Sequence, residues 1–528
     1  MAKQILSGED ARNAIKKGVE AIESAVKITL GPKGKNVVLD RKYATPLITN
    51  DGVTIAKEIE LSDPFENMGV NLIKEVSINT NDNAGDGTTT ACILASNMVL
   101  TGLKNIASGA NPIILRKGIE KAVKAVVSHL KEISKPVSSG KEIEQVASIS
   151  AGSEEIGKLI ALAFEKVGKD GVITIEESKT SQTELKITNG TQFDRGYISP
   201  YMVPQNATFS NLENPFILVC DKKITSINDI LGLLEEIMKT SRPLLIIAED
   251  VDGEALSTLA INSLRGSFNS VAVKAPSYGE KQKEFLEDIA LLTGATYISK
   301  DLNFDLKSIT IDELGEATNV KVYKDKTVIV GGNAKTEQIE ILKNKLEIMR
   351  ENETDNYELA KIEDRLARLV GGVAVIEVGA PSEIEMKEKK LRIEDALSAT
   401  KSASKEGIVA GGGTALIRCE KAIDEIIRNL SGDEKTGAEI VKSTLESPLR
   451  QIARNCGKDD GVIVNNVKQM PENFGYNALD DVYVNMFENG IIDPTKVTRC
   501  AIENAGSVAS SILTTEILVA DMVDDKNK

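Results

Sequence analysis

The chain has 528 residues, which is too long for one hydrophobic core and predicts roughly three or four domains. Apolar residues make up 41% of it and tryptophan is absent, so the cores must be mainly aliphatic. A net charge of −15 argues against nucleic acid as a partner, because its phosphate backbone would be repelled.

The number and spacing of cysteine and histidine residues limit the metal sites that the chain could form. The five cysteines are scattered without a C-x-x-C pair and there is one histidine, so a zinc site is nearly excluded and buried free thiols are expected. A charged helical pattern begins by residue 9 without an apolar signal region, and no apolar run reaches the roughly 18 residues of a membrane span. We therefore expect a cytoplasmic protein with no membrane partner.

The chain opens with a predicted helix and two short strands. Residues 7–10 resemble a capping box, and apolar residues follow at helical spacing, namely Ala11, Ile15, Val19, Ile22 and Val26. Gly31 followed by Pro32 should stop this helix. Short strands are predicted over residues 36–40 and 46–49.

A glycine-rich loop with three threonines is the most distinctive stretch. Residues 82–90 read DNAGDGTTT, and one apolar helix face follows, at Ala91, Leu94, Ala95, Met98 and Leu103. The helix start suits phosphate, Gly85 and Gly87 allow an anion to approach closely, and Asp86 offers a hard oxygen to Mg²⁺. An ordinary N-capped helix fits these residues equally well, but no Walker A motif occurs elsewhere to bind phosphate.

Changes of pattern predict the domain boundaries. The helical pattern breaks at residues 135–140, and a second boundary falls at residues 189–190. From there to residue 372, apolar strands alternate with helical stretches in βαβ patterning, near residues 216–219, 244–247 and 271–273. A charged helix is predicted over residues 383–405, and further helices continue to about residue 515. Composition thus gives helical ends around an α/β middle.

Seven motifs, in this order, resemble the group I chaperonins, the large-subunit family that includes bacterial GroEL. They lie at residues 29–34 (TLGPKG), 85–90 (GDGTTT), 193–197 (FDRGY), 243–250 (PLLIIAED), 385–390 (EMKEKK), 409–413 (VAGGG) and 493–499 (DPTKVTR). One glycine motif would be weak evidence, but an ordered set along most of the chain is specific.

The resemblance implies the chaperonin fold. A mainly α-helical equatorial domain, which binds ATP and makes ring contacts, would comprise residues 1–134 and 406–528. A small α+β intermediate domain would comprise residues 135–189 and 373–405. The α/β apical domain, residues 190–372, would bind clients and a co-chaperonin, with glycine pairs such as Gly371-Gly372 at the hinges.

The resemblance also implies a site for ATP with Mg²⁺, and K⁺ is a second candidate cation. Asp86 would hold Mg²⁺. The implied nucleotide contacts are Thr29, Leu30, Gly31, Pro32, Asn50, Asp86, Gly87, Thr88, Thr89, Thr90, Gly412, Asn477, Ala478, Leu479 and Asp493. For Asp493, a helix cap ahead of Pro494 competes with a contact to ribose. The family usually has lysine where Asn50 stands, so a side-chain contact with phosphate is in doubt there.

Two more carboxylates match the family's catalytic positions. Asp51, in a turn predicted over residues 50–52, and Asp395 would orient the attacking water and accept its proton. Asp395 lies outside the equatorial segments and would reach the nucleotide when the intermediate domain closes. Without the resemblance, Asp395 would be interpreted as an acid on a helix surface.

The resemblance implies an apolar rim for clients and the co-chaperonin. Its candidates are Tyr197, Tyr201, Met202, Leu231, Leu234, Leu256, Ala260 and Ile261. Several of these residues have helical spacing, and ordinary core packing is the competing interpretation.

We therefore expect an ATP-dependent chaperonin that encloses non-native proteins with a small co-chaperonin ring and promotes their folding. It would work as two stacked seven-membered rings, and the short strands at residues 36–40, 46–49 and 517–519 offer edges for pairing with neighbouring subunits. A soluble ATP-dependent enzyme such as a small-molecule kinase is the alternative, although an acceptor-site motif is lacking. A non-catalytic scaffold is a third class, against which the intact aspartates argue.

Overall fold

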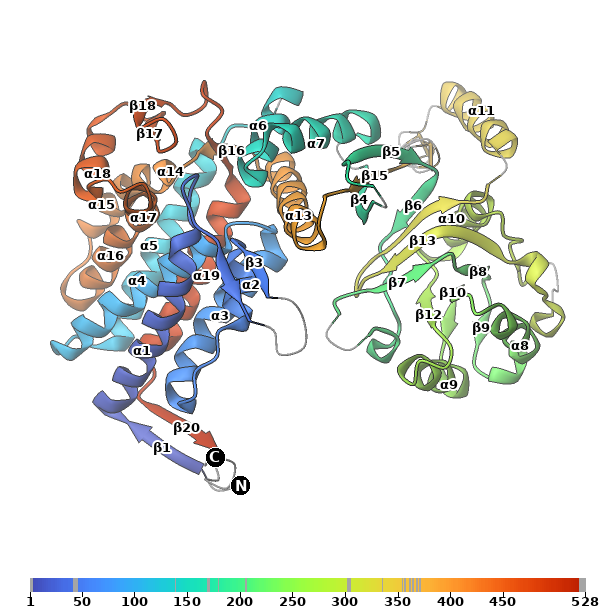
Figure 1. Ribbon diagram of the computed structural model, residues 1–528, viewed down its shortest axis with the longest axis horizontal. Coiled ribbons are helices and arrows are strands. Elements are labelled where there is room, and N and C mark those ends of the chain that lie inside the picture. Colours follow the sequence, from blue (N-terminus) through green and yellow to red (C-terminus); the bar gives the residue numbers. More distant parts are fainter. Residues whose placement is uncertain are drawn as a thin grey trace. The chain divides into compact units, whose positions relative to one another are not determined.

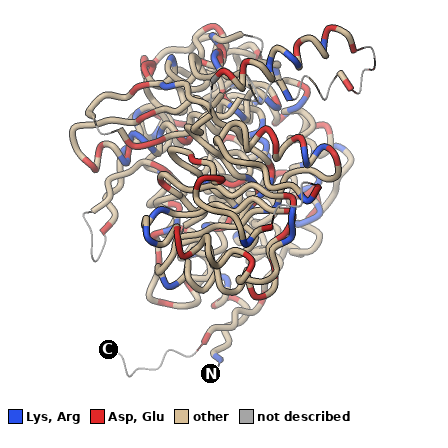
Figure 2. Tube along the Cα trace, turned by 90° about the vertical axis from the view of Figure 1, so that its right-hand side faces the viewer, with Lys and Arg blue, Asp and Glu red and all other residues tan. Residues whose placement is uncertain are grey.

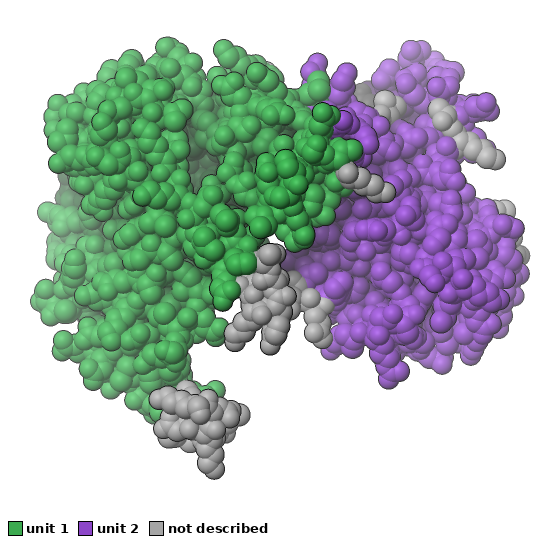
Figure 3. Space-filling model, in the orientation of Figure 1, with its two compact units in different colours: residues 1–162, 177–183, 378–528 green, residues 163–176, 184–377 purple. Residues whose placement is uncertain are grey.

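The computed structural model divides into two compact units (Figure 3). The helical unit comprises residues 1–162, 177–183 and 378–528, and the α/β unit comprises residues 163–176 and 184–377. The structure describes residues 3–521 except 41–45, 138, 169–170, 179, 205–206, 302–304, 335, 354, 356–357, 360–361, 363–364, 367–368 and 370–371. The expected hinge residue Gly371 lies outside the described residues.

Long helices from both ends of the chain build the core of the helical unit (Figure 1). They are α1 (Gly8–Val26), α3 (Pro64–Ala84), α4 (Thr88–Ala107), α5 (Pro112–Ile133), α16 (Gly432–Thr444) and α19 (Thr495–Leu513). The predicted apolar face of α1 is buried throughout. Glycine lets two of these helices approach closely, because a Cβ on Gly18 of α1 would lie 2.0 Å from the carbonyl oxygen of Glu66 in α3.

The termini of the described chain form a two-stranded ribbon. Strand β1 (Lys3–Ser7) pairs antiparallel with β20 (Ile517–Asp521), and the strand predicted over residues 517–519 is thereby confirmed. The predicted capping box is wrong, because Ser7 ends β1 and its side chain caps no N–H group of α1. The two predicted N-terminal strands are confirmed as β2 (Val37–Leu39) and β3 (Leu47–Thr49), which pair with each other.

Further helices and two strand pairs complete the helical unit. The helices are α2 (Gly52–Glu58), α6 (Gly140–Ala151), α13 (Glu383–Glu406), α14 (Thr414–Arg418), α15 (Glu420–Ile427), α17 (Ser447–Asn455) and α18 (Asp460–Gln469). Strand β16 (Ile408–Ala410) pairs with β19 (Ile492–Pro494), and β17 (Phe474–Asn477) pairs with β18 (Val482–Asn485). Helix α7 (Glu154–Val167) contributes residues to both units.

The α/β unit contains the predicted βαβ arrangement. Three parallel strands, β8 (Phe216–Val219), β10 (Leu244–Ala248) and β12 (Ser270–Lys274), are buried except at Lys274. Such burial is typical of strands covered on both faces. The helices between and after them are α8 (Leu231–Thr240), α9 (Gly253–Leu264) and α10 (Gly279–Thr293).

Antiparallel strands extend this sheet, and a smaller sheet accompanies it. The extension is made by β13 (Gly315–Val322), β14 (Thr327–Gly332), β6 (Gly190–Phe193) and β7 (Ser210–Glu213). The smaller sheet orders β4 (Val172–Glu177), β15 (Val373–Val378) and β5 (Glu184–Thr188). Helix α11 (Thr336–Asn352) follows β14 along the chain.

Three chemical features of the fold bear on the sequence analysis. All five cysteines are free, and four of them are buried, as expected. Among the described residues, no helix is both long and apolar enough to span a membrane. Acidic and basic residues are interspersed along the described trace (Figure 2).

Candidate functional site

The glycine-rich loop leads into a helix start that no side chain caps. Gly85 and Gly87 both have left-handed backbones, with φ of 74° and 77°, and Gly87 is the N-cap residue of α4. A Cβ on Gly85 would lie 2.2 Å from Cβ of Ser398, so only glycine fits between the loop and α13. Because a side-chain cap is missing, the first N–H groups of α4 are available to an anion.

Asp86 is fixed inside this loop by two donors. The N–H of Gly87 donates to Asp86 Oδ1 at 2.5 Å, and Ser150 Oγ of α6 donates to Oδ2 at 2.8 Å. Burial raises the pKa of Asp86, and these two hydrogen bonds oppose that shift. Ser150 belongs to none of the sequence motifs, so the sequence analysis missed it.

Asp51 caps a second helix that begins against the first. Its carboxylate accepts hydrogen bonds from the N–H groups of Val53 at 3.2 Å and Thr54 at 3.0 Å, so the predicted turn at residues 50–52 is instead the start of α2. A Cβ on Gly52 would lie 2.4 Å from Thr89 Oγ1, which places the N-terminus of α2 directly beside that of α4. Asn50 precedes this cap and is partly buried.

The two helix starts are joined by threonines. Thr29 Oγ1 and Thr89 Oγ1 lie 3.3 Å apart, and both side chains are buried. Thr88 is also buried, and its Oγ1 would be 2.8 Å from a Cβ on Gly52. The candidate phosphate contacts Thr29, Thr88 and Thr89 are therefore brought together, with Thr90 on the next, partly buried position of α4.

Helix α13 adds Asp395 to Asp51 and Asp86. It packs on the glycine loop, because Ser398 faces Gly85 and Ser402 Oγ donates to the carbonyl oxygen of Ala84 at 2.9 Å. Burial first, and then the negative charges of Asp51 and Asp86, raise the pKa of Asp395 well above its usual range. Asp395 is partly buried and so is not a plain surface acid, and α13 belongs to the helical unit together with the other two aspartates.

Asp493 lies beside the glycine loop that follows β16. It stands on β19 opposite Val409, and burial raises its pKa to about 7, with the charge of Asp86 adding to the shift and a hydrogen bond from Gly412 N–H opposing it. The capping interpretation is wrong, because Pro494 is the N-cap residue of α19 and no side chain caps that helix. Gly412 has a left-handed φ of 61°.

The loop at residues 29–32 is held by a side chain that the sequence analysis missed. Asn455 Nδ2 of α17 donates to the carbonyl oxygens of Lys27 at 3.0 Å and Leu30 at 2.8 Å. Gly31 is left-handed with φ of 85°, and a Cβ there would lie 3.1 Å from Ile452 Cγ1. Pro32 is exposed.

The candidate base contacts form the tip of the β17–β18 hairpin. Asn477 Oδ1 accepts hydrogen bonds from the N–H groups of Leu479 at 3.0 Å and Asp480 at 3.4 Å, so this side chain fixes its own turn. Ala478 is buried, and its carbonyl oxygen accepts the Sγ–H of Cys456 at 3.6 Å. Leu479 is 61% exposed.

These residues fit a nucleotide with Mg²⁺. Clustered carboxylates with raised pKa values favour a cation, and the uncapped N–H groups of α4 favour phosphate. Within the described residues, no group of three or more His, Cys, Asp and Glu side chains is arranged to hold a metal alone. A Mg²⁺ ion usually takes one or two protein carboxylates and completes its shell with phosphate oxygens and water, so Asp86 suffices as its protein ligand.

The candidate client-binding residues divide by exposure. Tyr201, Leu231 and Ile261 are 63%, 42% and 48% exposed. Tyr197 and Leu256 are partly buried. Met202, Leu234 and Ala260 are buried in the core of the α/β unit, so the core-packing interpretation holds for these three, and they present no surface to a client. Two further exposed apolar residues were not predicted, Met238 on α8 and Leu264 on α9, and each is 53% exposed.

The chain matches a protein-family model over most of its length. The model described as the TCP-1/cpn60 chaperonin family matches residues 22–522. This range includes Asp51, Asp86, Asp395 and Asp493.

Proposed function

Because the chain belongs to the TCP-1/cpn60 chaperonin family, we propose that it is a group I chaperonin subunit that couples ATP hydrolysis to protein folding. Membership establishes the chaperonin fold and a folding function, through ring assembly and client binding. The observation that supports the ATP-dependent part is the meeting of Asp51, Asp86 and Asp395 at the uncapped start of α4.

ATP is proposed to bind with its phosphates at the start of α4. The N–H groups of residues 88–90 and the hydroxyl of Thr89 would donate to phosphate oxygens, and Thr29, whose hydroxyl donates to the carbonyl oxygen of Val26 at 2.9 Å, would line the site beside Thr89. Asp86 would hold Mg²⁺, which neutralises phosphate charge when bound. The adenosine part would lie between Gly412 and the hairpin tip at residues 477–479. The side chain of Asp493 does not cap α19, so it would be available to accept hydrogen bonds from the ribose hydroxyls.

Hydrolysis would divide the work between Asp51 and Asp395. A water oxygen forms a bond to the γ-phosphorus while the bond from that phosphorus to the bridging oxygen breaks, and a carboxylate takes the water proton. The oxygens of Asp51 are fixed by the N–H groups of α2, which suits orientation of the water. Asp395, whose pKa is raised, suits proton uptake, and a divalent cation at Asp86 would return it to the carboxylate form.

Client capture is proposed for an exposed rim on the α/β unit, defined as Tyr201, Leu231, Met238, Ile261 and Leu264. Its helices α8 and α9 both pack on the short helix Ile227–Asp229, and the segment of Tyr201 packs on α9. A ring would repeat the rim and so raise the effective concentration for a client with several apolar segments. ATP and a small co-chaperonin ring would then displace the client into an enclosed cavity.

Ring assembly is proposed through strand edges of the helical unit. Within the part of the chain that the structure describes, the β1–β20 and β2–β3 pairs are two-stranded and have unpaired edges, and they expose Ile5, Val38 and Ile517 at 68%, 65% and 55%. Addition of one pair to the other across a subunit boundary would cover these side chains. Electron microscopy of the purified protein tests this assembly: two stacked seven-membered rings support the proposal, and monomers with and without nucleotide contradict it.

A further inference from the structure

Arg418 is a buried cation outside the nucleotide contacts proposed above. It ends α14 and is 5% exposed. Its Nε donates to the carbonyl oxygen of Glu472 at 3.0 Å, and its Nη2 donates to the carbonyl oxygens of Pro471 at 3.0 Å and Phe474 at 2.8 Å. One planar guanidinium thus binds three carbonyl oxygens of a single turn, those of Pro471, Glu472 and Phe474.

The turn held by Arg418 begins the hairpin that carries the candidate base contacts. The N–H of Phe474 closes the turn on the carbonyl oxygen of Pro471 at 2.9 Å, and β17 starts at Phe474. From there the register runs without a break to Asn477 opposite Val482. A displacement of the turn would therefore move the tip at residues 477–479.

The other end of α14 follows the glycine loop on the opposite side of the proposed base site. A Cβ on Gly412 would lie 3.8 Å from the carbonyl oxygen of Tyr476, so this loop faces the hairpin. A Cβ on Gly475 would lie 2.2 Å from Thr414 Oγ1, so the first residue of α14 touches the hairpin backbone. Helix α14 therefore contacts the hairpin at Thr414 and again through Arg418.

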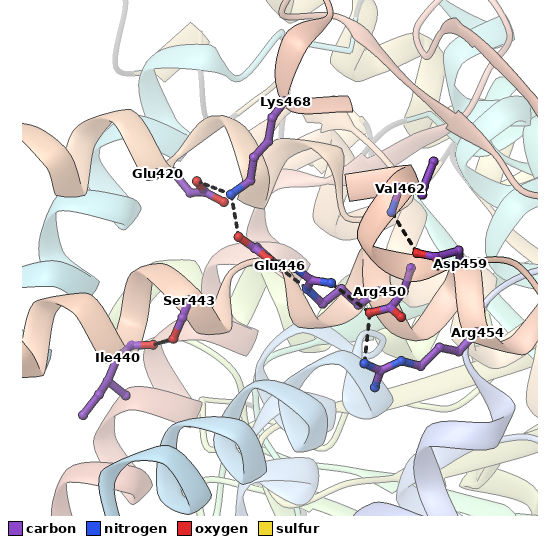
Figure 4. A network of polar contacts seen from close by, with 10 residues as sticks. Glu420, Ile440, Ser443, Glu446, Arg450, Arg454, Asp459, Val462 and Lys468 are labelled. Carbon is purple, nitrogen blue, oxygen red and sulfur yellow. Dashed lines mark hydrogen bonds and ion pairs between the residues drawn. The ribbon is translucent and has the colours of Figure 1, made fainter. Parts of the chain in front are cut away.

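The buried charge of Arg418 is supported by a network of polar contacts in the same region. Burial lowers the pKa of Arg418, while the nearby carboxylates of Glu472 and Glu420 favour its charged form. Glu420 is itself buried, and Lys468 Nζ lies 2.8 Å from its Oε2 (Figure 4). Lys468 also binds Glu446, which pairs with Arg450 of α17 (Figure 4). Burial of a cation is costly, and the three hydrogen bonds to the turn offset that cost, so the guanidinium and the turn hold each other in place.

We propose that Arg418 is a positioning residue that sets the affinity for the nucleoside part of the nucleotide by holding the hairpin tip against the Gly412 loop. The proposal rests on the proposed nucleotide site. The proposal treats the nucleoside half of that site separately from the phosphate half. Among the described residues, the hydrogen bonds of Arg418 go to the hairpin turn and none goes to α2 or α4, the proposed phosphate-binding helices.

Equilibrium binding of Mg-ATP and of Mg-tripolyphosphate, which lacks a nucleoside, tests this separation. The variants are Arg418→Lys, which keeps the charge but loses the fork, and Arg418→Met. Loss of charge-assisted hydrogen bonds should weaken ATP binding about 10–100-fold and leave tripolyphosphate binding within about twofold. The control Asp86→Asn should weaken both ligands.

Equal ATP affinity in the parental protein and Arg418→Lys would overturn the proposal, and so would equal losses for the two ligands. Hydrogen exchange on the parental protein covers the case in which the variants do not fold. ATP should slow exchange over residues 474–485 and tripolyphosphate should not; equal protection by both overturns the proposal. A parental protein that binds neither ligand would contradict the nucleotide site itself, which distinguishes the two failures.

Discussion

Ser150 Oγ donates a hydrogen bond of 2.8 Å to Asp86 Oδ2, which joins α6 to the glycine-rich loop before α4. The donor and acceptor are 64 residues apart in the chain. Because Asp86 is the residue proposed to hold Mg²⁺, this hydrogen bond would orient the carboxylate for the ion. The position of α6 is thereby linked to the state of the candidate metal ligand.

We expect Ser150→Ala to weaken Mg²⁺-dependent ATP binding by about tenfold, because the charged carboxylate loses a hydrogen bond worth about 1.5 kcal/mol. Ser150→Thr keeps the hydroxyl and is the matched control. Titration of ATP binding with Mg²⁺ measures the effect. Unchanged Mg²⁺ dependence in Ser150→Ala would mean that the hydrogen bond has no role in the site.

We expect Asp395→Ala to bind ATP but lose most turnover, by ~10²–10⁴, because it removes the proposed proton acceptor and leaves the start of α4 intact. Asp86→Ala should instead weaken binding of Mg-ATP. The exposed Glu385, near the start of α13, gives the control Glu385→Ala, which should hydrolyse at the parental rate. Parental turnover in Asp395→Ala would show that the proton acceptor is wrongly assigned.

The raised pKa of Asp493 predicts a pH dependence of stability. The folded state keeps the proton up to about pH 7, whereas an unfolded aspartate loses it near pH 4, so the folded state binds more protons in this window. The free energy of unfolding should therefore fall as pH rises from about 4 to 7, by up to about 4 kcal/mol from this group.

Asp493→Asn removes this titration and keeps an oxygen for Gly412 N–H. Thermal unfolding of nucleotide-free protein at pH 5 and pH 8 should show a smaller loss of stability in this variant than in the parental protein. Asp86 and Asp395 are present in both proteins, so the difference reports Asp493 together with its interaction with Asp86. Identical pH dependence in the two proteins would contradict the raised pKa.

Two leucines of α8 give opposite expectations for the same change. Leu231 is 42% exposed and Leu234 is 7% exposed. Leu231→Glu should keep the α/β unit folded and weaken capture of a denatured test protein, because burial of one leucine contributes roughly 1.5–3 kcal/mol. Leu234→Glu should unfold that unit, because it buries a charge without a partner.

Thermal unfolding and client capture on the full chain separate these cases, and Ile261→Glu repeats the first case on α9. Undiminished capture by both Leu231→Glu and Ile261→Glu would place the binding surface elsewhere. A stable Leu234→Glu variant would contradict the core packing.

Local pattern predicted much of the fold, and long-range pairing explains what it missed. Helix faces such as that of α1, and the buried strands β8 and β10, follow from spacing that neighbouring residues determine. Strand β1 was not predicted because its partner β20 lies at the other end of the chain. Its own residues are mostly exposed, so they show no alternation of buried and exposed side chains that would indicate a strand.

The site was predicted where a motif is contiguous and missed where it depends on tertiary contact. The loop around Asp86 is legible as a helix start, but Asn455 reaches Leu30 across 425 residues and Arg418 reaches Glu472 across 54. Spacing gave Leu231 and Leu234 as one set, yet only packing decides which of them faces the core. Asp493 was a candidate cap for the helix that follows it, but the N-cap residue of α19 is Pro494, and the local sequence pattern did not indicate this.

The most direct test of the account is the yield of a chemically denatured enzyme refolded by the purified protein with ATP and a co-chaperonin, compared with the same reaction lacking ATP and with the Asp395→Ala variant. We expect high recovery of enzyme activity for the parental protein with ATP. Recovery should stay near the spontaneous level in the reaction without ATP, and also with Asp395→Ala, because this variant cannot complete repeated rounds of hydrolysis. Equal recovery in all three reactions would contradict a folding cycle driven by hydrolysis at the Asp51, Asp86 and Asp395 site.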